Sequence, residues 1–188
     1  TPQDALRGCD EGLLEVLDHS QWLPAPDGTP ATEDFVEGAL SDCYVGNISW
    51  ATVPAYNRKT FCGIGSCADA PKDMKDFWDT KKYPGRRGLR KVPRVNLEWA
   101  LMADGVANAD IYDVLGTKEG QDRAFAKLDE LKDDIVWWEA GAQPPQLLAD
   151  GEVVMVTAYN GRLFNAMYVE KKPFEIMWGP QVFDLDTY

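Results

Sequence analysis

Apolar strand-like segments alternate with helix-like segments along this chain, and the alternation limits the possible folds more than any other feature. Each strand candidate is short and rich in β-branched or aromatic residues, and each helix candidate carries apolar residues at near-helical spacing. The strand candidates are residues 43–57, 88–92, 135–138, 153–159 and 174–178, and the helix candidates are 4–18, 73–79, 96–105, 117–131, 144–149 and 160–169. This order predicts an α/β architecture with mainly parallel pairing. A length of 188 residues fits one domain or two small interleaved ones.

The helix candidate at 117–131 carries the clearest boundary signal. Thr117 is a good N-cap, and Glu119 lies in the first turn, where a negative charge is favoured. Phe125, Leu128 and Leu131 are expected to form its buried stripe.

Four cysteines stand at Cys9, Cys43, Cys62 and Cys67, and the only histidine is His19. Because no CxxC pair occurs, a Cys/His zinc site is poorly supported, and two disulfides fit better. The simplest pairing is Cys9–Cys43 with Cys62–Cys67, although four cysteines allow three pairings. Disulfides indicate an oxidising compartment, either the periplasm or the outside of the cell. The chain opens with Thr1 rather than Met, so we expect that an upstream signal segment has been removed.

The charge balance argues against nucleic acid as a partner. The formal net charge is -12 and the pI is about 4.5, so the surface repels phosphate backbones. One stretch is nevertheless basic, and a solvated loop that balances local charge is favoured over a functional patch. Its members are Lys81, Lys82, Arg86, Arg87, Arg90, Lys91 and Arg94.

Enzyme motifs are scarce. His19 would have to serve any Ser or Cys triad, and no GxSxG, GxGxxG or Walker sequence occurs, since Gly63-Ile64-Gly65 is too short to count. Asp184 and Asp186 face the same side if they lie on a strand. Such a pair serves as acid and base, as metal ligands or as receptors for an ammonium group, whereas the alternative is an exposed strand edge.

Aromatic side chains gather at or near predicted strand ends, Trp50 and Tyr159 among them. Aromatic faces together with carboxylates bind organic cations through cation–π and ionic contacts. Core packing is the alternative interpretation, and it is favoured for Trp137 and Phe183.

Several separated segments, in the right order, resemble bacterial extracellular solute-binding proteins of ABC importers, in particular the spermidine/putrescine-binding group. The similar segments are residues 11–18, 76–79, 83–89, 96–101, 146–155 and 158–162. The resemblance implies a type II periplasmic-binding-protein fold with two lobes joined by crossover strands and a ligand held between them. It also implies an exported, non-enzymatic protein without a cofactor that delivers its ligand to a membrane permease.

Members of that group are much longer, so the resemblance implies a fragment with a complete second lobe and a partial first lobe. The expected division is residues 1–53 in the first lobe, 54–157 in the second, and 158–188 returning to the first. Segments 48–56 and 153–159 would be the crossovers. Apolar surface exposed by a partial lobe makes a dimer or a domain exchange conceivable.

The resemblance also assigns ligand contacts. Tyr159 stands where the family has a stacking tryptophan, and Asp186 stands where a carboxylate meets an amine. Asp184 replaces an aromatic residue and Gln3 a tyrosine, and acidic residues that the polyamine binders carry near residues 94–96 are missing. The full set of expected ligand residues is Tyr159, Asp184, Asp186, Gln3, Gln143, Arg162, Trp50 and Glu98.

These assignments give one main hypothesis and two alternatives. The main hypothesis is a periplasmic receptor for a small, polyamine-like organic cation. Free backbone amides in residues 139–143 and the cation of Arg162 could instead receive a carboxylate, so a zwitterionic amino acid or betaine is the first alternative. A metal-dependent hydrolase that uses Asp184 and Asp186 is the second.

Overall fold

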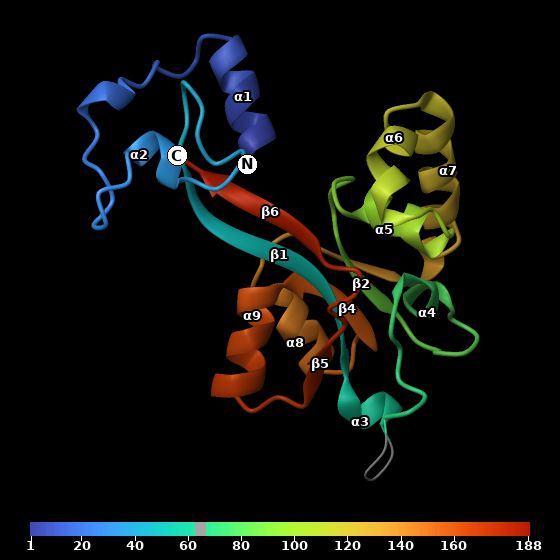
Figure 1. Cartoon of the computed structure of the whole chain (residues 1–188). Coiled ribbons are helices and arrows are strands. Elements are labelled where there is room, and N and C mark those ends of the chain that lie inside the picture. Colours follow the sequence, from blue (N-terminus) through green and yellow to red (C-terminus); the bar gives the residue numbers. More distant parts are fainter. Residues whose placement is uncertain (63–66) are drawn as a thin grey trace. The chain divides into compact units, whose positions relative to one another are not determined.

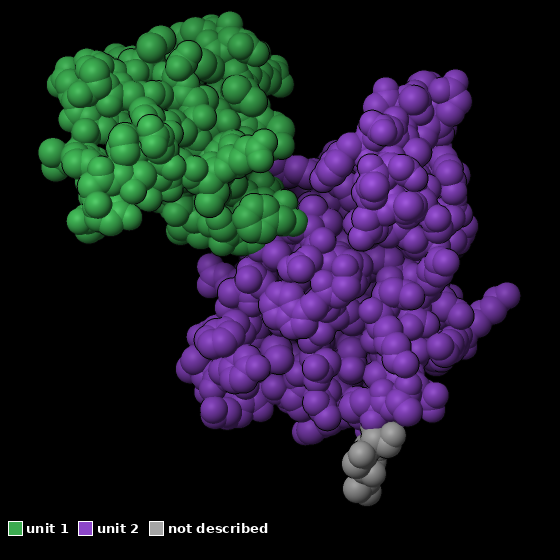
Figure 2. All heavy atoms as spheres, in the orientation of Figure 1, with its two compact units in different colours: residues 1–50, 183–188 green, residues 51–182 purple. Residues whose placement is uncertain are grey.

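The computed structural model describes residues 1–62 and 67–188 of the chain. Spatial contacts divide it into unit 1, residues 1–50 with 183–188, and unit 2, residues 51–182 (Figure 2). The chain thus leaves unit 1 after Trp50 and re-enters it at Phe183. Unit 2 is longer than the expected second lobe of residues 54–157, and the lobe boundaries of the complete protein remain a prediction.

The strands form one mixed sheet with the order β3-β2-β4-β1-β5, and β6 pairs with β1 (Figure 1). Their bounds are β1 (Gly46–Asn57), β2 (Arg87–Arg90), β3 (Ile135–Trp138), β4 (Met155–Tyr159), β5 (Phe174–Ile176) and β6 (Val182–Thr187). The α/β prediction is confirmed, but the expectation of mainly parallel pairing is wrong. Parallel pairing is restricted to β2 with β3 and β2 with β4, whereas β1 runs antiparallel to β4 and β5.

The helices explain where the parallel pairs lie. Parallel neighbours need a crossover connection, which α5 to α7 supply between β2 and β3, and α8 between β3 and β4. The α-helices are α1 (Pro2–Asp10), α2 (Ala31–Asp34), α3 (Arg58–Phe61), α4 (Met74–Trp78), α5 (Asn96–Ala103), α6 (Ile111–Leu115), α7 (Lys118–Asp129), α8 (Gln143–Ala149) and α9 (Asn160–Phe164), and a π-helical turn, η4 (Asn165–Val169), follows α9. Within the described ranges, no helix has both the length and the apolar character needed to span a bilayer.

The sheet of unit 2 is covered on both faces (Figure 1). One apolar cluster, which includes Phe77, Leu89 and Trp99, packs with α4, α5 and α7. The other, which includes Trp138 and Leu163, packs with α8 and α9. Because both faces are buried, the central strands read as continuous apolar runs rather than as an alternating pattern. The core packing expected for Trp137 and Phe183 is wrong, because both side chains are exposed.

Two predicted helix features are wrong. The helix expected over 4–18 ends at Asp10, because Gly12 takes a positive φ of 68° and its amide donates to the Cys9 carbonyl. In α7, Thr117 caps the helix as predicted by accepting from the Gly120 amide. Phe125, however, is 52 % exposed, and the buried residue of that turn is Ala124.

Both disulfides of the simplest predicted pairing are present. Cys9–Cys43 lies within unit 1 and Cys62–Cys67 within unit 2. The glycines at 63 and 65 that suggested a tight loop lie outside the described residues.

Candidate ligand-binding site

The carboxyl ends of three parallel strands meet at one edge of the sheet in unit 2. β2 ends at Arg90, β3 at Trp138 and β4 at Tyr159, and β2 lies between the other two. In open α/β sheets, ligands bind outside the carboxyl ends of the strands, so this edge is the place to look for a site.

The Arg90 guanidinium lies over two aromatic side chains at this edge. Its Cζ atom lies 5.9 Å from the ring centroid of Trp138 and 5.6 Å from that of Tyr159. The two rings meet edge to face, with centroids 5.7 Å apart and an interplanar angle of 89°. Trp138 is fully buried and Arg90 is half-buried. We call these three residues the Arg90 cluster.

The Arg90 guanidinium has no counter-ion in the part of the chain that the structure describes. Every ion pair found there involves other cations. Desolvation makes such a cation interact more strongly with an anion than an exposed arginine does, and its planar fork matches a carboxylate. The arrangement therefore suits a ligand that carries an anionic group.

The loop after β3 supports the Tyr159 ring. A Cβ atom added to Gly141 would lie 2.8 Å from a ring carbon of Tyr159, so only glycine permits this approach. The side-chain oxygen of Gln143 accepts from the Glu139 amide at 2.9 Å and from the Ala140 amide at 2.7 Å. These two amides are therefore not free for a ligand, contrary to the expectation for residues 139–143.

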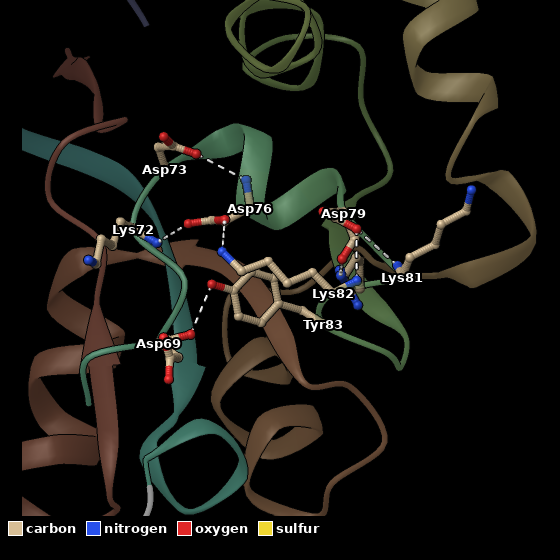
Figure 3. A network of polar contacts seen from close by, with 9 residues as sticks. Asp69, Lys72, Asp73, Asp76, Asp79, Lys81, Lys82 and Tyr83 are labelled. Atoms are coloured by element: carbon tan, nitrogen blue, oxygen red, sulfur yellow. Dashed lines mark hydrogen bonds and ion pairs between the residues drawn. The ribbon is translucent and has the colours of Figure 1, made fainter. Parts of the chain in front are cut away.

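The first residues of the basic stretch, Lys81 and Lys82, belong to a network of polar contacts with Asp76 and Asp79 (Figure 3). The amides of Lys81 and Lys82 donate to the carboxylate of Asp79. The ammonium of Lys82 lies 3.2 Å from the carboxylate of Asp76. The hydroxyl of Tyr83 and the carboxylate of Asp76 together raise the pKa of Lys82. These contacts agree with local charge balance for this part of the stretch.

Arg87 belongs to the same stretch but is completely buried. Its guanidinium donates to the backbone carbonyls of Phe77, Gly85 and Asp79, which joins α4 to the start of β2. Burial lowers the pKa of Arg87 to about 10. Arg87 therefore has a structural role. Arg90, three residues later, is the arginine without a counter-ion among the described residues.

The residues expected to contact a ligand divide between the two units. Unit 2 holds Tyr159, Gln143, Glu98 and Arg162, and unit 1 holds Gln3, Trp50, Asp184 and Asp186. In unit 2, Tyr159 joins the Arg90 cluster, Glu98 is buried, and Arg162 is exposed on α9. In unit 1, Asp184 and Asp186 lie on β6 with Leu185 buried between them, so the two carboxylates share a face of the strand, and Gln3 is exposed on α1.

Arg90 and Trp138 were missed from the sequence as ligand residues. Arg90 was counted with the basic stretch, although it falls within a predicted strand, at 88–92, that is followed by a predicted helix. Its position near the carboxyl end of a predicted parallel strand was the available signal.

Ligand sites of open α/β sheets lie at the carboxyl ends of their strands and combine aromatic side chains with a few polar or charged groups, as the Arg90 cluster does. The sequence profile of bacterial extracellular solute-binding proteins matches residues 1–187, and the chain belongs to this family. The resemblance expected at the level of the family is thereby confirmed.

Three relatives illustrate the similarity. The gamma-aminobutyric acid-binding protein of Pseudomonas aeruginosa is 50 % identical over 181 residues, which are 96 % of this chain and 47 % of that protein. An ABC transporter substrate-binding protein from Bradyrhizobium japonicum is 41 % identical with a TM-score of 0.80, covering 97 % of this chain and 52 % of the other. A solved GABA receptor is 32 % identical with a TM-score of 0.75, covering 97 % and 51 %. The chain thus spans about half the length of these relatives.

The similarity to polyamine-binding proteins is more distant. A spermidine/putrescine substrate-binding protein from Streptococcus pneumoniae is 15 % identical with a TM-score of 0.63, covering 96 % of this chain and 53 % of that one, which shows a shared fold alone. The narrower resemblance to the polyamine-binding group is therefore not supported beyond the fold.

Proposed function

We propose that this chain is the ligand-binding part of an exported receptor that captures an amino-acid-like zwitterion and delivers it to an ABC permease. The observation that carries the ligand class is the Arg90 cluster. Membership in the extracellular solute-binding family supports the receptor role, the permease partner and a location outside the cytoplasm. No catalytic step is part of the proposal.

The carboxylate of the ligand would bind the Arg90 guanidinium. The guanidinium lies over the rings of Trp138 and Tyr159, and a cation over an aromatic ring keeps its N–H groups as hydrogen-bond donors to an anion. A charge-assisted hydrogen bond of this kind contributes about 1.5–3 kcal/mol. A polyamine offers Arg90 only a like charge, and for that reason the zwitterion replaces the polyamine as the main hypothesis.

Two relatives with GABA in their names agree with this ligand class. γ-Aminobutyrate has a carboxylate at one end of a short apolar chain and an ammonium at the other. For a ligand ammonium, the sequence predicts Asp184 and Asp186 as partners, and this stays a prediction.

Calorimetric titration of the natural full-length protein with γ-aminobutyrate and with putrescine tests the proposal. The two ligands are matched, because both carry an ammonium on a short unbranched chain and only γ-aminobutyrate has a carboxylate. We expect binding of γ-aminobutyrate and little binding of putrescine. Arg90→Gln should weaken the binding of γ-aminobutyrate by roughly 10- to 150-fold, because a charged hydrogen bond is lost.

Two further variants locate the binding groups. Arg123→Gln is the matched control, because this arginine is exposed on α7 and pairs with Asp104, and the variant should bind like the wild type. Asp186→Asn should weaken any ligand that carries an ammonium, by about 1–3 kcal/mol. Tight putrescine binding without γ-aminobutyrate binding would overturn the proposal, and so would an Arg90→Gln variant of unchanged affinity.

A further inference from the structure

We propose that Asn96 is a positioning residue that fixes the backbone of Arg90 and thereby sets the affinity for the ligand carboxylate. The inference rests on the proposed function, because it concerns the same subsite. It assigns a role to a buried amide that no sequence pattern pointed to.

A single nitrogen of Asn96 closes the turn that follows β2. Its Nδ2 atom lies 2.7 Å from the carbonyl oxygen of Arg90 and 2.7 Å from that of Val92. The side-chain amide has two N–H groups, so both are used. Asn96 is only 2 % exposed, and water therefore cannot replace these donors. The amide holds the backbone segment from which the Arg90 side chain projects.

The same turn is attached to the neighbouring strand. The Val92 amide donates to the Arg90 carbonyl at 2.8 Å, and the Lys91 amide donates to the Trp138 carbonyl at 2.9 Å. Arg90 and Trp138 are also register partners across β2 and β3. Fixing this turn consequently fixes Arg90 relative to the ring on which it stacks.

Asn96 reaches this position through an unusual backbone conformation. Val95, the residue before it, has a φ of 72° and is buried. A β-branched residue at positive φ is strained and persists only where its surroundings determine it. Here the Trp99 amide donates to the Val95 carbonyl at 3.0 Å, and the Leu97 amide donates to the Pro93 carbonyl at 3.0 Å. These two hydrogen bonds hold Val95 in its strained conformation. The same backbone geometry places the Asn96 amide against the carbonyls of Arg90 and Val92.

Asn96→Asp is the sharpest variant, because it keeps the size of the side chain and removes both donors. Asn96→Ala removes the donors without adding a charge, and it serves if the aspartate variant does not fold. Tyr83→Phe is the matched control. It also removes a buried side-chain donor to a backbone carbonyl, that of Asp69 at 2.9 Å (Figure 3), but Tyr83 precedes β2, whereas Asn96 follows its carboxyl end.

The first measurement needs no ligand. The side chain of Arg90 lies over two aromatic rings, so ring currents should shift the NMR signals of its protons. The signals that disappear in Arg90→Lys are those of Arg90. We expect the shifts to collapse in the Asn96 variants and to persist in Tyr83→Phe. Unchanged shifts in the Asn96 variants would overturn the inference. Because the result is independent of binding, it remains decisive if the proposed function fails.

The second measurement is a double-mutant cycle by calorimetry with γ-aminobutyrate in the full-length protein. Asn96→Asp should weaken binding about tenfold in the wild-type background, and Tyr83→Phe should not. In the Arg90→Gln background the Asn96 effect should vanish, because Asn96 acts through Arg90. An equal loss in both backgrounds would contradict the positioning role. Absence of γ-aminobutyrate binding to the wild type would instead count against the proposed function.

Discussion

Units 1 and 2 differ in how they are held together. Unit 2 surrounds its sheet with two apolar clusters that contain fully buried side chains such as Leu89, Trp138 and Leu148. The buried apolar residues of unit 1 are few, namely Ala39, Cys43, Tyr44 and Leu185. Large apolar side chains of unit 1 stand exposed, Leu23 at 87 % and Val16 at 77 % among them.

Unit 1 relies on specific local contacts instead. The Cys9–Cys43 disulfide connects α1 to the segment before β1, and the backbones of Val45 and Tyr188 exchange two hydrogen bonds of 2.9 Å. At Gly46 an added Cβ would collide with Leu185 and Ala39, so the chain packs closely there. The comparison teaches that one chain stabilises one unit by burial and the other by covalent and polar links, and the two should fail under different treatments.

The largest expected difference comes from removing the same side chain in each unit. Leu89→Ala in unit 2 should lower the free energy of unfolding by about 2.7–5 kcal/mol, because Leu89 is fully buried and a cavity remains. Leu23→Ala in unit 1 should change it by less than about 0.5 kcal/mol, since Leu23 is exposed. Urea unfolding of the two variants measures both values, and equal losses would show that the two units do not differ in this way.

Removal of a disulfide should destabilise unit 1 more than unit 2, the reverse of the order expected for the leucine substitutions. Replacing Cys9 and Cys43 by alanine opens a loop of sequence separation 34, and we expect a loss of roughly 2–4 kcal/mol. Replacing Cys62 and Cys67, which are separated by only 5 residues, should cost about 2 kcal/mol. Amide hydrogen exchange assigned to each unit is the measurement. Faster exchange confined to unit 2 in the Cys9 and Cys43 variant would contradict the comparison.

A smaller effect separates the units by pH. Burial, reinforced by the charge of Glu175, raises the pKa of Tyr56 in unit 2 above its ordinary value of 10. The folded state therefore holds this proton more tightly than the unfolded state does. Its contribution to stability is complete below pH 10 and disappears as the pH rises through the raised pKa. Tyr56→Phe should remove this part of the alkaline decline, as followed by thermal unfolding between neutral and alkaline pH.

Unit 1 supplies the control on the acid side. Hydrogen bonds from Ser20 and Gln21 lower the pKa of Asp18. Its contribution is present above the ordinary value of 3.8 and is lost as the pH falls through the lowered pKa. Asp18→Asn should alter only the acid limb of the stability curve, and a change in the alkaline limb would contradict the assignment.

Much of the fold could be predicted from local pattern. The segments β1, β3, β4, α7 and α8 appear within a few residues of their expected positions, because apolar runs and caps such as Thr117 act locally. The end of α1 and the exposure of Phe125 were missed. The apolar period continues past Asp10, but Gly12 at positive φ ends the helix there. In α7, Phe125 fits the period, but Ala124 is the residue that packs against the core.

The candidate site could be predicted only in part. Tyr159 was expected to stack on a ligand because it stands where the resembled family has a stacking tryptophan, and the structure puts it in the Arg90 cluster. As members of the basic stretch, Arg87 and Arg90 were not separated, since they are the same residue type three positions apart. Arg87 is buried and donates to backbone carbonyls, so its role is structural. Arg90 lies over aromatic rings, and its charge remains available to a ligand.

The sequence by itself determined the strand–helix alternation, the compartment suggested by the cysteines and the family to which the chain is similar, because each depends on residue type and spacing alone. Only the tertiary structure decided which cation faces a ligand. β2 lies between β3 and β4 in space although they follow it in the chain, so Trp138 and Tyr159 arrive on either side of Arg90 from 48 and 69 residues away in sequence. The order of the strands in the sheet brings these three side chains together, and no local sequence pattern encodes that order.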